Sequence, residues 1–116
     1  MPSPTELTLK QLRKEGWICE VVEHWNHHAK CKQDLFGCVD VIAFNALETR
    51  LVQATSASNV AARVKKCRQW PGWSTWKYRR DRRFQVWGWR ERTATSKLGK
   101  GDTAVGKNWI VRKVEV

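Results

Sequence analysis

The pattern of apolar and polar positions divides the chain into two helical segments and five extended ones. Leu7 and Leu12 lie among the apolar positions of the first helix, which Gly16 ends, and Val60 and Val64 recur at helical spacing in the second. Runs rich in β-branched and aromatic residues predict strands. The predicted helices are residues 5–15 and 60–69, and the predicted strands are residues 17–25, 38–44, 51–55, 84–89 and 109–116.

The connections between these elements are polar or rich in turn residues. We expect residues 26–33 and 92–107 to be loops and residues 56–59 to cap the second helix. Alternation in residues 109–116 predicts either an edge strand or the arm of a hairpin. The order α-β-β-β-α-β with one added strand predicts an α/β fold, a mixed central sheet flanked by helices, in a single domain over residues 1–116.

A carboxylate interrupts the predicted strand at residues 38–44. Valine, isoleucine and phenylalanine make this strand apolar on both faces, yet Asp40 lies in its middle. Side chains alternate along a strand, so Gln53 and Thr55 share one face of the following strand. An ionised carboxylate is costly to bury unless it is paired or binds a metal. Asp40 therefore needs a partner.

Asp34, Asp40 and Gln53 form the candidate site that these polar positions suggest. Two carboxylates and an amide carbonyl at neighbouring strand ends supply the oxygen ligands that Mg²⁺ or Mn²⁺ prefers. Such a cation polarises a phosphoryl oxygen and lowers the pKa of an attacking water, as hydrolysis of a phosphodiester requires. The alternative is a capped turn at Asp34 and a hydrogen-bonded core aspartate at Asp40.

Positive charge is concentrated in the second half of the chain. The net charge is +11, and residues 60–92 hold eleven lysines and arginines against two acidic residues. Such a distribution favours nucleic acid over a membrane as partner, because no segment has the apolar face that membrane insertion needs. Trp87 and Trp89 alternate in a predicted strand, so we expect them in the core. The expected phosphate-binding residues are Arg63, Lys65, Lys66, Arg68, Lys77, Arg79, Arg80, Arg82 and Arg83.

Histidines and cysteines offer a second metal hypothesis. Mixed ligands of this kind can hold Zn²⁺, but no CxxC pair is present and the spacing matches no standard finger, so a solvated loop is the alternative. The residues concerned are His24, His27, His28 and Cys31, with Cys19 or Cys38. Four cysteines are too few for a disulfide scaffold, and the polar N-terminus is unlike a secretory signal. Both features predict reduced thiols in an intracellular, cytoplasmic protein.

The element order, with an acid in the second strand and a polar pair in the third, resembles the restriction-endonuclease-like nucleases of the PD-(D/E)XK superfamily. The similarity extends to archaeal-type Holliday junction resolvases and small phage or viral relatives, and it covers residues 5–89. Asp40 matches the acid of the second strand, Gln53-Ala54-Thr55 the (D/E)XK motif and Glu6 the acid of the first helix. The resemblance implies Mg²⁺-dependent hydrolysis of DNA, with branched or single-stranded regions among the substrates. It also implies a homodimer, with the C-terminal strand as the candidate interface.

Two residues depart from that motif. Gln53 replaces the second acid, although its carbonyl can still bind a metal, and Asp34 and Glu23 could restore the missing negative charge. Thr55 replaces a lysine, and a hydroxyl cannot supply the positive charge that stabilises the phosphate. Either a basic residue from elsewhere takes over that task, or the site is slow or inactive. The candidate replacements are Arg63, Lys65 and Lys32. A nucleic-acid-binding module without catalysis is therefore the alternative function.

Overall fold

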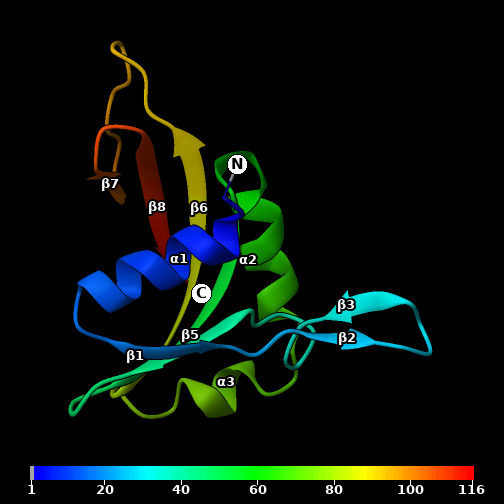
Figure 1. The fold of residues 1–116 in the computed structure, drawn as a ribbon. Helices are drawn as coiled ribbons and strands as arrows, with labels where there is room; N and C mark the ends of the chain where they lie inside the picture. The colour runs from blue at the N-terminus through cyan, green and yellow to red at the C-terminus, as the bar shows by residue number, and fades with distance from the viewer. Residues whose placement is uncertain (1) are drawn as a thin grey trace.

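A mixed six-stranded sheet forms the centre of the computed structural model, which describes residues 2–116 (Figure 1). The strands lie in the order β1 (Ile18–Val21), β4 (Val41–Phe44), β5 (Thr49–Ser56), β6 (Arg82–Glu91), β8 (Trp109–Glu115) and β7 (Asp102–Val105). The helices are α1 (Pro4–Lys14), the 3-10 turn η1 (Ala57–Asn59), α2 (Val60–Arg68) and α3 (Trp73–Trp76). Within residues 2–116, no helix combines the length and the apolar character needed to cross a bilayer.

β5 and β6 run parallel, whereas all other neighbouring strands of the sheet are antiparallel. A parallel pair cannot be joined by a tight turn, so the chain crosses from β5 to β6 through η1, α2 and α3. The predicted α/β class, with a mixed central sheet and flanking helices, is confirmed.

Local sequence signals set both ends of α1. The Ser3 hydroxyl accepts a hydrogen bond from the backbone N–H of Glu6, and the Glu6 carboxylate accepts one from the N–H of Ser3, which completes a capping box. Pro4 lies in the first turn, where its missing N–H leaves no bond unmade. Arg13 and Lys14 lie in the last turn, close to the free carbonyls and the negative end of the helix dipole.

α1 packs against one face of the sheet, and α2 with the short α3 packs against the other. α1 covers the face that carries Val52, Trp87 and Trp89, and the indole N–H of Trp89 donates a 2.9 Å hydrogen bond to the hydroxyl of Thr8 in α1. α2 covers the opposite face, which carries Leu51. Leu51 and Val52 belong to different cores because successive side chains of a strand point to opposite faces. Trp87 and Trp89 are buried, as predicted.

A two-stranded hairpin projects from the sheet between β1 and β4 (Figure 1). It consists of β2 (His24–Asn26) and β3 (Cys31–Gln33), which pair antiparallel. The prediction of one continuous strand over residues 17–25 is wrong, because β1 ends at Val21 and the chain then turns out of the sheet. The prediction of a loop over residues 26–33 is also wrong at residues 31–33, whose partners lie on β2.

The second predicted strand begins later than expected. Cys38 lies in a turn, Val39 forms an isolated bridge with Leu35, and Asp40 lies in a bend directly before β4 instead of in the middle of a strand. All three residues are buried. The predicted caps of α2 are wrong as well. Neither Ser56 nor Asn59 makes a side-chain capping bond; the Asn59 amide donates instead to the Ser56 hydroxyl at 3.1 Å.

The C-terminal segment adds two strands rather than one. β7 lies inside the predicted loop 92–107 and pairs with β8 as a hairpin, which confirms the hairpin interpretation of residues 109–116. β8 is hydrogen-bonded to β6 on one side and, over residues 109–112, to β7 on the other.

Gly88 in β6 lies where the sheet meets the start of α2, which generates a stability prediction. A Cβ at this position would clash with Cγ2 of Val60 and lie 3.0 Å from Cα of Ala57. We expect Gly88→Ala to lower the free energy of unfolding by about 1–3 kcal/mol, because the helix must move away from the strand. Urea denaturation measures the change.

The control is Gly99→Ala, since a Cβ at Gly99 would meet its nearest atom, Oδ2 of Asp102, at an ordinary 3.5 Å. This variant should unfold close to the wild-type midpoint. A Gly88→Ala variant as stable as the wild type would contradict the close packing of α2 on β6.

Candidate metal centre

Asp40 and Gln53 face each other across two neighbouring strands. Val41 of the antiparallel strand β4 pairs with Val52 of β5. Asp40, one residue before Val41, therefore comes opposite Gln53, one residue after Val52. Oδ2 of Asp40 accepts a 2.5 Å hydrogen bond from Nε2 of Gln53 and a 2.8 Å bond from the backbone N–H of Ala54. The two side chains are only 4% and 2% exposed. β5 thus supplies the partner that the buried carboxylate needs.

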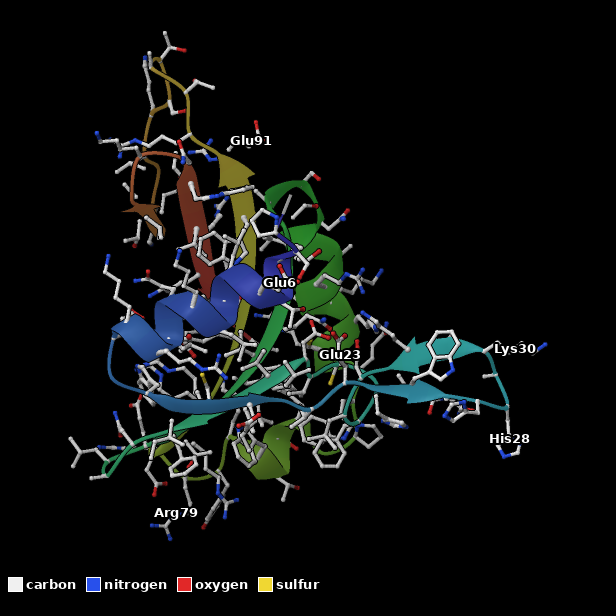
Figure 2. The ribbon with its side chains drawn as sticks, viewed as in Figure 1. Glu6, Glu23, His28, Lys30, Arg79 and Glu91 are labelled. Atoms are coloured by element: carbon white, nitrogen blue, oxygen red, sulfur yellow. The ribbon has the colours of Figure 1, made fainter. Side chains whose placement is uncertain are left out.

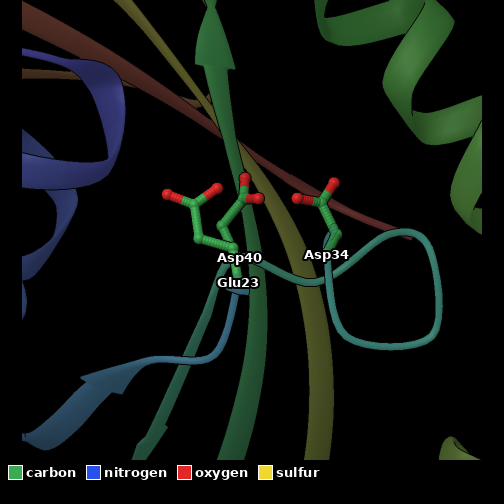
Figure 3. A group of neighbouring side chains, drawn as sticks. All are labelled: Glu23, Asp34 and Asp40. Carbon is green, nitrogen blue, oxygen red and sulfur yellow. The ribbon is translucent and has the colours of Figure 1, made fainter. Parts of the chain in front are cut away.

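Two further carboxylates lie beside Asp40. Glu23 lies directly before the hairpin begins and Asp34 directly after it ends. One oxygen from each of the three carboxylates lies within 4.8 Å of the other two. Figure 3 shows the three groups gathered around one region. This spacing suits a single hard cation with several oxygen ligands. Asp34 and Glu23, which the sequence suggested as additional acids, therefore belong to the same group as Asp40, named here the acidic group.

The surroundings of Asp40 favour its protonated form. The pKa of Asp40 is raised from 3.8 to about 7. Burial is the largest cause, followed by a hydrogen bond to Asp34 and the negative charges of Asp34 and Glu23. The N–H of Ala54 acts in the opposite direction. A bound cation would favour the ionised form of all three carboxylates.

The Gln53 amide shows that the group fits a metal ion. Its nitrogen donates to Asp40, but its carbonyl oxygen Oε1 is buried and has no hydrogen-bond partner. A buried polar atom without a partner costs about 1–3 kcal/mol. An amide carbonyl is a good ligand for Mg²⁺ or Mn²⁺, so a cation shared with the carboxylates would satisfy Oε1. Of the four predicted metal ligands, Glu23, Asp34 and Asp40 thus lie within reach of one ion, and the Gln53 amide is hydrogen-bonded to Asp40.

Two lysines flank the acidic group. The Nζ of Lys66 on α2 lies 3.8 Å from Oδ2 of Asp34, and its side chain is 45% exposed. Lys66, Lys32 and Asp34 line a hollow of about 400 Å³. An exposed ion pair of this kind contributes little to stability, so the lysine is free to exchange its carboxylate partner for a phosphate.

The other residues suggested for the site are Thr55, Glu6 and three basic residues, of which only Lys32 lines the hollow at Asp34. Thr55 is buried on the same face of β5 as Gln53, two residues further along. Glu6 is exposed, and its carboxylate closes the cap of α1 on the opposite face of the sheet, so it is not part of the acidic group. Arg63 and Lys65 do not line the hollow beside Asp34, whereas Lys32 does.

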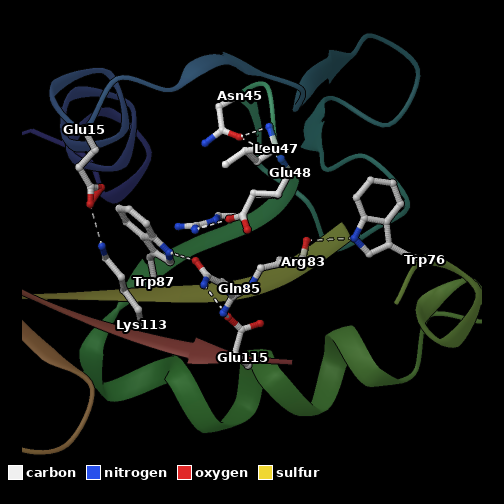
Figure 4. Close-up of polar contacts among 11 residues, drawn as sticks. Glu15, Asn45, Leu47, Glu48, Trp76, Arg83, Gln85, Trp87, Lys113 and Glu115 are labelled. Atoms are coloured by element: carbon white, nitrogen blue, oxygen red, sulfur yellow. Dashed lines mark hydrogen bonds and ion pairs between the residues drawn. The ribbon is translucent and has the colours of Figure 1, made fainter. Parts of the chain in front are cut away.

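Part of the predicted phosphate-binding run holds the fold together (Figure 4). Arg83 forms an ion pair with Glu115, and its backbone carbonyl accepts a 2.9 Å hydrogen bond from the indole N–H of Trp76. Lys77 donates to the backbone carbonyl of Val116. These contacts tie the segment after α3 to the end of β8.

This basic segment also lies away from the acidic group. Arg82 pairs with Thr49, the first residue of β5, whereas Gln53 lies four residues further along the strand. At the usual rise of 3.3 Å per residue, the separation along β5 is about 13 Å. Arg79 pairs with Asp81 at 3.1 Å and lies on the opposite side of the molecule from the hairpin tip in Figure 2. Phosphate binding by this run stays a prediction.

The histidines and cysteines do not form a zinc site. His24, His27, His28 and Cys31 are exposed on the hairpin, and the acidic group is the only set of three or more potential ligands gathered within residues 2–116. All four cysteines are free, and the three other than Cys31 are buried, as expected. A hydrogen bond with Cys38 and, after it, burial raise the pKa of the Cys67 thiol.

Lys66 is the residue beside the carboxylates whose position the sequence did not predict. The sequence places it among phosphate-binding residues of the second helix, but not as the cation beside the carboxylates. Its contact with Asp34 joins residues 32 positions apart, and helical periodicity carries no information about such a contact.

The raised pKa of Asp40 generates a prediction for the metal-free protein. Unfolding lets Asp40 release its proton near pH 3.8, whereas the folded state holds it until about pH 7. The folded state binds more protons between these values, so the free energy of unfolding should fall as the pH rises through that window. Asp40→Asn removes the effect and should gain up to about 4 kcal/mol over the wild type between pH 4 and pH 8. Urea denaturation in EDTA across this range measures it.

The control is Glu20→Gln, which removes an exposed carboxylate of β1 and should leave the pH profile close to that of the wild type. Parallel profiles for the wild type and Asp40→Asn would show that Asp40 ionises as readily in the folded chain as in the unfolded one.

No protein-family model matches this chain, and no curated protein or solved structure gives a significant match. The functional conclusion therefore rests on the residues and the geometry described above.

Proposed function

We propose that the protein is a metal-dependent DNA endonuclease that hydrolyses phosphodiester bonds. The observation that carries this proposal is the convergence of Glu23, Asp34 and Asp40 beside a buried amide whose carbonyl has no partner. Hard divalent cations take such ligands, and phosphodiester hydrolysis uses such cations to stabilise the charge that develops on the phosphate.

The topology of the sheet supports the same proposal. Apart from the inserted hairpin, α1, β1, β4, β5, α2 and β6 follow the α-β-β-β-α-β order for which the chain resembles the PD-(D/E)XK nucleases. Asp40 borders the second strand of that order and Gln53 lies in the third, in place of the second acid of the motif. The hydrogen bond between these two motif positions supports the proposal.

The residues in and around the acidic group have different proposed roles. Glu23, Asp34, Asp40 and the carbonyl of Gln53 would hold Mg²⁺ or Mn²⁺, which when bound polarises the phosphoryl oxygen and lowers the pKa of an attacking water. The Gln53 and Ala54 N–H groups both bind Oδ2 of Asp40, which orients the carboxylate. Asp40 must lose its proton to serve as a ligand, so binding is favoured as the pH rises toward 7.

Lys66 is the basic residue best placed to replace the lysine that Thr55 lacks. Its ammonium group lies on the edge of the acidic group, 3.8 Å from Asp34, and is partly exposed to an incoming phosphate. Thr55 offers only a hydroxyl. A cation that contacts the phosphate as negative charge develops stabilises the transition state.

A nucleic-acid-binding module without catalysis is the second candidate. The observation that favours it is the absence of a basic side chain at Thr55, which is buried two residues beyond Gln53 on the same face of β5. In that case the acidic group would still bind a cation, and the basic residues of α2 would still bind phosphates.

An assay of DNA cleavage separates the two candidates. We expect linear, single-stranded or four-way DNA to yield products in Mg²⁺ or Mn²⁺ and none in EDTA. Asp40→Ala should lower the rate at least about 100-fold, on the scale of removing one electrostatic group from an active site. Glu20→Ala is the control, because Glu20 is an exposed acid of β1 outside the acidic group. Metal-dependent DNA binding without products would support the binding module, and products formed in EDTA would contradict both.

The proposed role of Lys66 generates a separate prediction. Lys66→Ala should lower the cleavage rate by about 100-fold, because the charge beside the phosphate is lost. Lys65→Ala is the matched control: it removes the same charge from the adjacent position of α2, which does not line the hollow at Asp34. Equal losses in the two variants would indicate a general electrostatic effect of α2 instead of a specific contact.

A further inference from the structure

The hairpin formed by β2 and β3, residues 24–33, is attached to the acidic group at both ends. Glu23 precedes its first residue and Asp34 follows its last. Figure 2 shows Glu23 at its base and His28 and Lys30 at its tip, away from the sheet. A two-stranded ribbon buries little apolar surface and gains little stability by itself. This hairpin, named here the arm, therefore projects directly from the proposed metal ligands.

The arm has the composition of a nucleic-acid-binding element. Its ten residues contain no acid, two lysines and three histidines. Trp25 is 52% exposed and belongs to neither hydrophobic core. An indole left half in water on a projecting ribbon does not contribute to folding as Trp87 does in the core. Its exposed ring is available to stack on another flat apolar group.

The pairing of the arm sets Trp25 beside a lysine that lines the hollow at Asp34. Trp25 and Lys32 are direct cross-strand partners, so their side chains share one face of the ribbon. Lys32 lines the hollow together with Lys66 and Asp34. The exposed ring of Trp25 is therefore a direct neighbour of one of the two lysines beside the acidic group.

We propose that the arm binds an unpaired stretch of the DNA strand that enters the acidic group. Trp25 stacks on one base, and Lys32 and Lys66 bind neighbouring phosphates of the same strand. The bases must be unpaired because a duplex buries their faces in its own stack, whereas a single strand presents them to an aromatic side chain. The inference rests on the proposed function and specifies its substrate class as single-stranded DNA, free or within a branched structure.

A second exposed aromatic residue provides the comparison. Tyr78 is 89% exposed and lines a separate hollow with Arg79 and Arg82. It also combines a ring with basic groups, but it lies in the segment before β6, away from the acidic group. If unpaired bases stacked there, the arm would have no part in binding.

Binding of labelled oligothymidylate in EDTA, followed by fluorescence anisotropy, tests the arm without metal or cleavage. Trp25→Ala should weaken binding by about 5- to 150-fold, the range expected for one lost base stack, and Trp25→Phe should restore most of it. Lys32→Ala should reduce the slope of log K against log salt by about 0.7, the value for one phosphate contact on a single strand. Tyr78→Ala and Lys100→Ala, two exposed positions outside the arm, are the controls.

The outcomes separate this inference from the proposed function. Wild-type affinity in Trp25→Ala, a loss in Tyr78→Ala instead, or no binding of oligothymidylate by the wild type would each overturn the role of the arm. None of these results depends on hydrolysis, which the Asp40→Ala assay tests by itself. Equal weakening of a duplex of the same length by Trp25→Ala would also overturn it, because stacking requires an unpaired base. Unchanged thermal midpoints confirm that the variants are folded.

Discussion

The pairing of β4 with β5 is the constraint on which the candidate site depends. It sets Asp40 opposite Gln53, so one buried oxygen accepts hydrogen bonds from the Gln53 amide and from the N–H of Ala54. A shift of one residue in this register would turn Gln53 to the face that α1 covers and place an apolar side chain against the carboxylate. The chemistry of the site is therefore a consequence of strand register, which the two hydrophobic cores on either face maintain.

The acidic group is costly in the absence of a cation. Three carboxylates lie close together, the pKa of Asp40 is raised to about 7, and the carbonyl of Gln53 has no partner. Each of these features disfavours the folded chain, and one divalent ion would relieve all three. The packing of α1 and α2 on the sheet offsets this cost, as is usual where a protein retains an unfavourable polar cluster for function.

Positive charge serves two purposes in this chain. Near α3, Arg83 and Lys77 bind Glu115 and the C-terminal backbone, so part of the basic segment stabilises the fold. Near the acidic group, Lys32 and Lys66 line the same hollow as Asp34. Only the second pair lies where it could offset the repulsion between the carboxylates and a phosphate. A count of basic residues along the sequence does not distinguish the two.

The sequence by itself determined the features that arise from local periodicity and local chemistry. Leu7 and Leu12 predicted the first helix, the alternation at Trp87 and Trp89 predicted a buried strand, and the buried Asp40 required a partner on the following strand. The sequence also suggested Asp34 and Glu23 as acids of the same site. Tertiary structure alone decided that Lys66 lies beside Asp34 and that the polar segment between Glu23 and Asp34 is a hairpin. The physical reason is the distance along the sequence over which each feature is determined. A helix or strand repeats over a few residues and leaves a trace in the sequence, whereas contacts between residues far apart depend on how the chain turns between its elements.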